Sequence, residues 1–179
     1  DKMIALITEH FSDLPKRSDR RDVPRYDVPA HEPTLVSIVS DKEATSSSVA
    51  LLSKRTRRPE NTAGAARAGL KADLFSAMLN ARFDEIEHRA SPPFLSAFAG
   101  NFQFTRSTSL FFVQAQVKDG LQAKGLEALL EETARVRTHG FLASELERAK
   151  REQVAQLDRA YAERDKTESL RRNDAKAGA

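Results

Sequence analysis

The chain contains no cysteine and no tryptophan, and only seven of its 179 residues are glycine. Without cysteine, it has no disulfides, thiol nucleophiles or thiolate metal ligands. No apolar run is long enough to span a bilayer, and no signal-peptide pattern opens the chain. The glycines form no loop suited to a phosphate group. What is present is a chain of one-domain length that can bury a core, with 40% hydrophobic and 31% charged residues.

Basic residues outnumber acidic residues by 29 to 26, which gives a net charge of +3 and a pI near 9.3. The basic residues gather at 16–21 and 54–58. Such clusters attract phosphate groups, which makes nucleic-acid binding a remote alternative. Acidic residues accompany the basic ones along both C-terminal helical segments, however, and no aromatic residue interleaves with the clusters to stack on bases. A solvated protein surface is therefore the better interpretation.

Hydrophobic periodicity and turn residues divide the chain into helices and strands. In order, the predicted elements are a helix over 2–14, strands over 35–40 and 47–54, a helix over 62–89, strands over 94–105 and 109–118, and helices over 121–138 and 144–163. This order predicts an α+β fold, a two-layer domain in which helices pack on one face of an antiparallel or mixed sheet. The predicted organisation is a helix at 1–14, an extended connector at 15–33, the main domain at 34–165 and a charged tail at 166–179.

Apolar stripes predict which side chains form the core. The predicted rows are Leu70, Leu74 and Met78 with Phe75 and Leu79 on the long helix, Phe94, Phe98, Phe102 and Phe104 on one strand, Phe111, Val113, Ala115 and Val117 on the next, and Leu126, Leu129, Leu130, Leu146, Val154, Leu157 and Tyr161 on the last two helices. We expect Leu74 and Phe111 to be buried, so that alanine at either position costs about 2–5 kcal/mol.

Two signals mark the junction between the last two helices. Gly140 stands where a C-terminal cap belongs. Ser144, followed three residues later by Glu147, has the pattern of a capping box. Together they predict a sharp change of direction between the two helices.

No group of residues in the sequence has the pattern of a catalytic or metal site. His31–Glu32 comes nearest to the zinc-binding H-E-x-x-H motif, but Leu35 occupies the second histidine position and His31 lies between prolines. Asp84 and His88 have a helical spacing that suits a shared metal. Without a third ligand, an exposed ion pair is the better interpretation.

The remaining polar candidates have simpler explanations than catalysis. They are the carboxylates Glu43, Glu85 and Glu87, interpreted as surface charges; Ser46, Ser47 and Ser48, which lack the G-x-S-x-G elbow; and His10 and His139, which stand near helix C-termini, where the dipole favours positive charge. The sequence therefore predicts no catalytic, cofactor-binding or metal-binding residue.

Six segments carry a resemblance to a known family. They are TLVSIVSDKEATSSSVALLSK from Thr34, LKADLFSAMLNARFDEI from Leu70, PPFLSAFAG from Pro92, FFVQAQVKDG from Phe111, GFLASELERAK from Gly140 and AYAERDKTES from Ala160. With ALITEHFSDLP from Ala5, which resembles the helix after the first strand of the domain, they make the chain similar to the insulinase-like (pitrilysin, inverzincin) zinc metallopeptidases. The resemblance implies a clamshell of two halves, each with two related α/β domains, enclosing a chamber in which peptides are cut.

The resemblance also indicates which domain this is. The family's zinc motif is H-x-x-E-H on a helix, and this chain lacks it, so zinc is expected in the parent protein and not in this fragment. Arg82 lies at the place of an arginine that helps the second half of the family hold its substrate, but Arg89 stands where that half has a tyrosine. The resemblance therefore favours the second, non-catalytic domain of the first half.

We therefore expect a fragment of a zinc metallopeptidase that forms chamber wall and supports the zinc-bearing domain. The alternative is a non-peptidase interaction or assembly module of the same fold. The expected partners are the rest of the parent chain and, in the full-length chamber, a peptide substrate; neither a membrane nor a nucleic acid is expected. Large bacterial relatives suggest a periplasmic or exported location, and the sequence itself leaves the compartment unknown.

The chain starts at Asp1, without an initiating methionine, and runs straight into a helical pattern. We therefore expect it to lack an upstream strand of the sheet. A sheet edge exposed in this way would present unpaired backbone groups. Weak self-association of the isolated fragment through that edge is the expected result.

Overall fold

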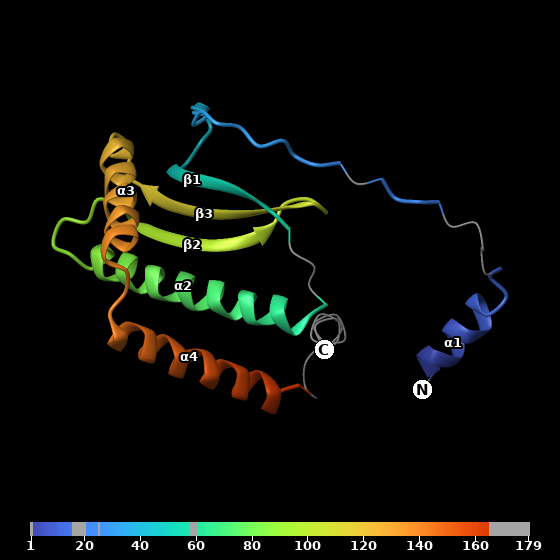
Figure 1. The fold of residues 1–179 in the computed structure, drawn as a ribbon. Helices are drawn as coiled ribbons and strands as arrows, with labels where there is room; N and C mark the ends of the chain where they lie inside the picture. Colours follow the sequence, from blue (N-terminus) through green and yellow to red (C-terminus); the bar gives the residue numbers. More distant parts are fainter. Residues whose placement is uncertain (1, 16–20, 25, 58–60, 165–179) are drawn as a thin grey trace.

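The structure is a computed structural model that describes residues 2–15, 21–24, 26–57 and 61–164. The predicted tail at 166–179 and part of each basic cluster lie outside these residues. Figure 1 shows a body of sheet and helices, from which an extended arm leads to a separate N-terminal helix. In chain order the elements are α1 (Lys2–Phe11), β1 (Ser47–Thr56), α2 (Ala63–Glu87), β2 (Ser96–Gln103), β3 (Thr108–Val117), α3 (Gln122–His139) and α4 (Ala143–Ala162).

The sheet is antiparallel, with strand order β1-β3-β2. Its central strand β3 pairs Val113 with Leu51 of β1 and with Ala99 of β2. Because side chains alternate between the two faces of a strand, these residues share one face. That face packs against α2 and α3, while α4 packs on α2. The predicted α+β class, with helices on one face of the sheet, is confirmed.

The core lies between the sheet and α2 and α3. Its largest fully buried side chains are Leu79, Phe83, Phe94 and Leu129. The rings of Phe83 and Phe94 meet edge to face, with centroids 6.2 Å apart, a favourable aromatic geometry. The predicted inward row of β3 is confirmed for Val113, Ala115 and Val117, which are buried, whereas Phe111 packs against the core but is only partly buried.

Helix α3 approaches the sheet closely at Gly125. A Cβ atom at this position would lie 2.4 Å from Cγ1 of Val117 and 3.6 Å from Cγ2 of Val49. The glycine therefore lets the first turns of α3 rest directly on β1 and β3.

The predicted helix ends are partly right. Gly140 is the C-cap of α3, with φ 69° and its N–H donating to the carbonyl of Val136. Helix α4, however, begins one residue before the predicted cap Ser144. Leu142 is its N-cap residue, and the carboxylate of Glu145, not that of Glu147, accepts from the Leu142 N–H.

The predicted strand at 35–40 is wrong. These residues are extended but pair with no strand in the described chain, and Leu35, Val36, Ile38 and Val39 are 69–90% exposed. Their β-branched composition does favour a strand, but β propensity expresses packing against neighbours, and here no neighbour is present. The predicted elements at 47–54, 62–89, 94–105, 109–118, 121–138 and 144–163 are present with small shifts of their ends.

Several predicted core positions are also wrong. Leu74 is only half-buried, and the exposed residues are Leu70, Phe75, Phe98, Phe102, Phe104, Leu130, Val154, Leu157 and Tyr161. On α4, the one buried side chain in the described residues is Ala149. An apolar stripe identifies the face of a helix or strand that prefers burial, but it does not supply the layer that covers it.

Helix α1 forms as predicted, but no described residue of it is buried. In Figure 1 it lies well apart from the sheet and the other helices. Ile4, Ile7 and Phe11, which form its predicted apolar face, are more than half exposed. The proposed assignment of residues 1–14 to the start of this domain stays a prediction.

Candidate functional site

Two surfaces of the body are candidates for function. One is a charged cleft on the helical side, beside a buried arginine. The other is the face of the sheet that the described helices leave uncovered. No described helix is long and apolar enough to cross a bilayer.

Arg82 of α2 is the most extensively paired charged residue described in the helical layer. Its Nε and Nη2 donate to the two carboxylate oxygens of Glu145 at 2.7 and 2.9 Å. Its Nη1 donates to Glu132 of α3 at 3.0 Å, and Nη2 also donates to the carbonyl of Gly140 at 3.1 Å. The guanidinium lies 4.9 Å from the centroid of the Phe141 ring. Arg82 therefore joins α2 to the end of α3 and the start of α4.

Arg82 and Glu145 each stabilise the charged form of the other. The hydrogen bond from Arg82 lowers the pKa of Glu145 to about 2, with help from the Leu142 N–H, against the opposing effect of burial. The two carboxylates raise the pKa of Arg82 further above its ordinary range. Because Glu132 is 6% exposed, removal of the arginine would leave a buried carboxylate without its strongest partner.

A cleft of about 840 Å³ opens beside this network. Its walls carry charges of both signs, among them Glu85, Arg89, Glu131 and Arg135. A second hollow of about 330 Å³ continues along α3 and shares several of these residues. The mixture of signs and the open shape favour solvated ion pairs more than a small-molecule pocket, which is usually apolar and enclosed.

The opposite face of the sheet carries a group of aromatic side chains, which we call the aromatic face: Phe98, Phe102, Phe104 and Phe112. The ring of Phe112 lies 5.7 Å from that of Phe98 and 5.6 Å from that of Phe102, and Phe104 continues the row 6.3 Å from Phe102. Between the two strands, Gly100 pairs with Phe112. A Cβ there would lie 3.0 Å from the Phe98 ring and 3.2 Å from that of Phe112, so the rings occupy the space over the glycine.

The aromatic face is largely open to solvent. Phe98, Phe102 and Phe104 are 43–58% exposed, and Leu52, paired with Phe112 on the same face, is 66% exposed. Of the row predicted for the core, Phe94, Phe98, Phe102 and Phe104, only Phe94 is buried. Contiguous exposed apolar surface of this kind marks an interaction site more often than a plain exterior.

The predicted site residues are scattered. Asp84 and His88 form the exposed ion pair expected of them, with Nδ1 of His88 3.6 Å from the carboxylate and 2.7 Å from the Asp84 carbonyl. The Asp84 carbonyl and carboxylate raise the pKa of His88. His31 contacts the carbonyl of Pro33 in the arm, while His10 and His139 lie in the last turns of α1 and α3.

The other predicted candidates are surface groups. Glu43 and Glu85 are exposed, and the hydroxyl of Ser47 donates to Asp119 at 2.6 Å at the end of the sheet. The part of the chain that the structure describes has no cluster of three or more potential metal ligands, so its residues do not fit a zinc site. That the chain binds no stoichiometric zinc and cuts no peptide by itself stays a prediction.

Sequence reasoning singled out Arg82 but missed its partners. The signal for Glu132 was available, because this carboxylate falls on the buried stripe of α3 with Leu129 and Val136. A charge on an apolar stripe predicts a buried partner. Glu145 could have been found as the acidic residue in the first turn of α4. The guanidinium assigned by resemblance to a substrate-holding position is thus hydrogen-bonded within its own domain.

Comparisons with known proteins agree with this architecture. Over 172 residues, the chain is 28% identical to a protein of Arabidopsis thaliana described as "Zinc protease PQQL-like"; the match covers 96% of this chain and 15% of that protein. The crystal structure of the periplasmic protease PqqL from Escherichia coli matches with a TM-score of 0.74 at 20% identity, over 93% of this chain and 18% of PqqL. A structure of the first half of PqqL matches with a TM-score of 0.75 at 20% identity, over 93% of this chain and 36% of that half.

The chain therefore spans only a small part of each of these relatives. The family model described as the Peptidase M16 inactive domain matches residues 1–153. This match covers the arm, the sheet and most of the helical layer. The resemblance to the insulinase-like peptidases is confirmed, and the chain belongs to the Peptidase M16 family as an inactive domain.

Proposed function

We propose that this domain forms part of the wall of the peptide chamber in a zinc metallopeptidase and supports the zinc-bearing domain beside it. The observation that carries the proposal is the aromatic face, since the strands turn their exposed phenylalanines away from the helical layer. A chamber wall needs this polarity, with a solvated exterior and an interior that offers apolar contacts to unfolded peptides. Aromatic side chains bury much apolar area and lose little side-chain entropy.

The match to the first half of PqqL supports a position next to the catalytic domain. PqqL is a periplasmic protease, and we propose an exported location for the protein that carries this domain. Zinc belongs in this proposal to the catalytic domain. In this proposal the present domain shapes the chamber and contacts the peptide, and the catalytic domain carries out the bond cleavage.

The test is peptide cleavage by the full-length protein with Phe98→Ser and Phe102→Ser. Each change removes apolar contact for a bound peptide while leaving the buried core intact. We expect kcat/KM to fall about five- to tenfold, mostly through KM, as follows from losing about 1–1.4 kcal/mol of apolar contact. Leu157→Ser is the matched control, because Leu157 is 56% exposed against 55% for Phe98 but lies on the outer helix α4.

Unchanged kcat/KM in both phenylalanine variants, with normal melting midpoints, would refute the chamber-wall role. A protein that assembles other proteins without cutting them is the alternative. It would show no zinc-dependent cleavage at all in the unmodified full-length form.

A further inference from the structure

The segment 34–40, which we call the free segment, has the composition of a buried strand but no partner. Leu35, Val36, Ile38 and Val39 are 69%, 80%, 90% and 88% exposed. Leu35 and Val39 project to one side of an extended chain, and Val36 and Ile38 project to the other. Apolar residues on both sides are typical of a strand in the interior of a sheet that is covered on both faces.

Strand β1 has an unpaired edge on the side of the body where the free segment lies. The sheet order leaves β1 with one neighbour, β3, and no described residue pairs with the other edge of β1. Unpaired strand edges are ready to accept another strand. The free segment and β1 therefore present two open rows of backbone donors and acceptors.

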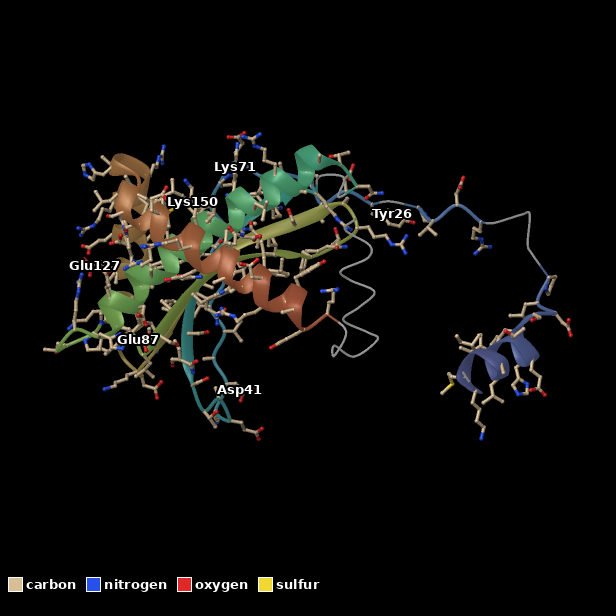
Figure 2. All side chains as sticks on the ribbon, turned by 90° about the horizontal axis from the view of Figure 1, so that it is seen from below. Tyr26, Asp41, Lys71, Glu87, Glu127 and Lys150 are labelled. Atoms are coloured by element: carbon tan, nitrogen blue, oxygen red, sulfur yellow. The ribbon has the colours of Figure 1, made fainter. Side chains whose placement is uncertain are left out.

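Contacts on either side of the free segment hold the arm near the start and the end of β1. At one end, the turn at 41–44 reverses the chain, with the Glu43 N–H donating to the Asp41 carboxylate at 2.8 Å. At the other end, Nζ of Lys54 donates to the carbonyl of Pro29 at 2.7 Å. Figures 1 and 2 both show the free segment running alongside β1. Asp41, labelled in Figure 2, marks the turn between them.

Despite this arrangement, no backbone hydrogen bond in the described chain joins the free segment to β1. Two strands connected by a short turn ordinarily pair directly as a hairpin. The arm is instead fixed at both ends with its middle unpaired. We call the space between these two unpaired backbones the slot; a strand lying there could form hydrogen bonds to both.

We propose that one β-strand from the remainder of the parent chain inserts between the free segment and β1, so that the free segment becomes part of the sheet. The proposal rests on the proposed function in taking this domain to be part of a longer peptidase. The chain spans 15% of its plant relative and 36% of the solved first half, so relatives hold ample further sequence. The match to that half covers 93% of the 179 residues, so it omits at most about 13 of them. Because β1 begins only at Ser47, the match must extend into the arm.

Hydrogen exchange provides the test, since its readout does not depend on peptidase activity. In the full-length protein, the amides of 35–39 should exchange on the order of a hundredfold more slowly than in the 179-residue chain. The amides of 113–117 on β3 serve as the control and should be protected in both. Fast exchange at 35–39 in the full-length protein would overturn the proposal.

Proline substitutions give a second readout. Ser37→Pro removes a backbone donor from the middle of the free segment, while Ala30→Pro makes the same change at an exposed arm residue outside it. Both variants of the 179-residue chain should melt like the parent sequence. In the full-length protein only Ser37→Pro should lower the melting midpoint; equal midpoints for the two variants would overturn the proposal.

Two other occupants of the slot have distinct signatures. If a second copy of this chain fills it, protection at 35–39 appears in the 179-residue chain and rises with concentration. If the free segment closes directly onto β1, protection appears there at every concentration. Either result would reject insertion of a strand from the remainder of the parent chain. It would leave the chamber-wall proposal open, because that proposal is tested separately by the Phe98 and Phe102 variants.

Discussion

Arg82 and Glu145, separated by 63 residues in sequence, are joined by two parallel hydrogen bonds of 2.7 and 2.9 Å. This bidentate geometry fixes both the distance and the relative orientation of α2 and the first turn of α4. Because the same carboxylate also accepts from the Leu142 N–H, the pair ties the inter-helix link to the start of α4 itself. One guanidinium therefore links α2 to the start of the outer helix.

The first prediction concerns that guanidinium. Arg82→Ala should lower the free energy of unfolding by about 3–5 kcal/mol, because among the described residues the buried Glu132 then keeps only Arg135 as a partner and Glu145 keeps only the Leu142 N–H. Arg67→Ala, at an exposed position on the same helix, is the control and should change the value by less than about 0.5 kcal/mol. Urea unfolding of the two variants measures the difference. Equal midpoints would show that the network contributes nothing to stability.

The second prediction concerns acid. The folded-state pKa of Glu145 is about 2, below the ordinary value of 4.5. A lowered pKa contributes stability that is present above the unfolded pKa and is lost as pH falls toward the folded value. Unfolding free energy should therefore decline between about pH 4.5 and pH 2, by an amount on the order of 2–3 kcal/mol from this residue.

Glu145→Gln should flatten that decline, since glutamine does not titrate. The matched variant Glu147→Gln alters an exposed carboxylate that pairs with Lys150 on the same helix. It should leave the slope nearly unchanged. If both variants retain the full acid dependence, the titrating group lies elsewhere.

The third prediction compares two helical glycines. Gly125→Ala would place a Cβ 2.4 Å from Val117, so it should destabilise the domain by about 1–3 kcal/mol through overpacking. Gly69→Ala on α2 meets nothing within 4 Å and should stabilise by about 0.5–1 kcal/mol through improved helix propensity. Thermal unfolding should therefore shift in opposite directions. A shift of the same sign in both variants would contradict the close approach of α3 to the sheet.

Much of the fold could be predicted from local pattern. Local signals in the sequence located the ends of the long helix and the turn before α3. The alternation of apolar residues on β3 likewise identified the buried side chains Val113, Ala115 and Val117. The errors have a common physical cause. Leu157, Phe98 and Ile38 are apolar at regular spacing, yet their burial depends on a layer or strand that the described residues do not provide.

The site was harder to predict for a related reason. Arg82 was recognised by resemblance, but its role depends on Glu132 and Glu145, which the fold brings to it from 50 and 63 residues away. Such convergence is a property of the tertiary structure. The exposed Asp84–His88 pair was predictable, because both residues lie on one helix four positions apart.

The two faces of the sheet differ in how much they contribute to stability, and this difference is useful in protein engineering. Residues that stabilise the fold, such as Arg82, Phe83 and Gly125, lie on the helical side, whereas Phe98 and Phe102 on the aromatic face are 55% and 43% exposed. Substitutions at Phe98 and Phe102 should therefore alter the surface of the domain at little cost in thermal stability.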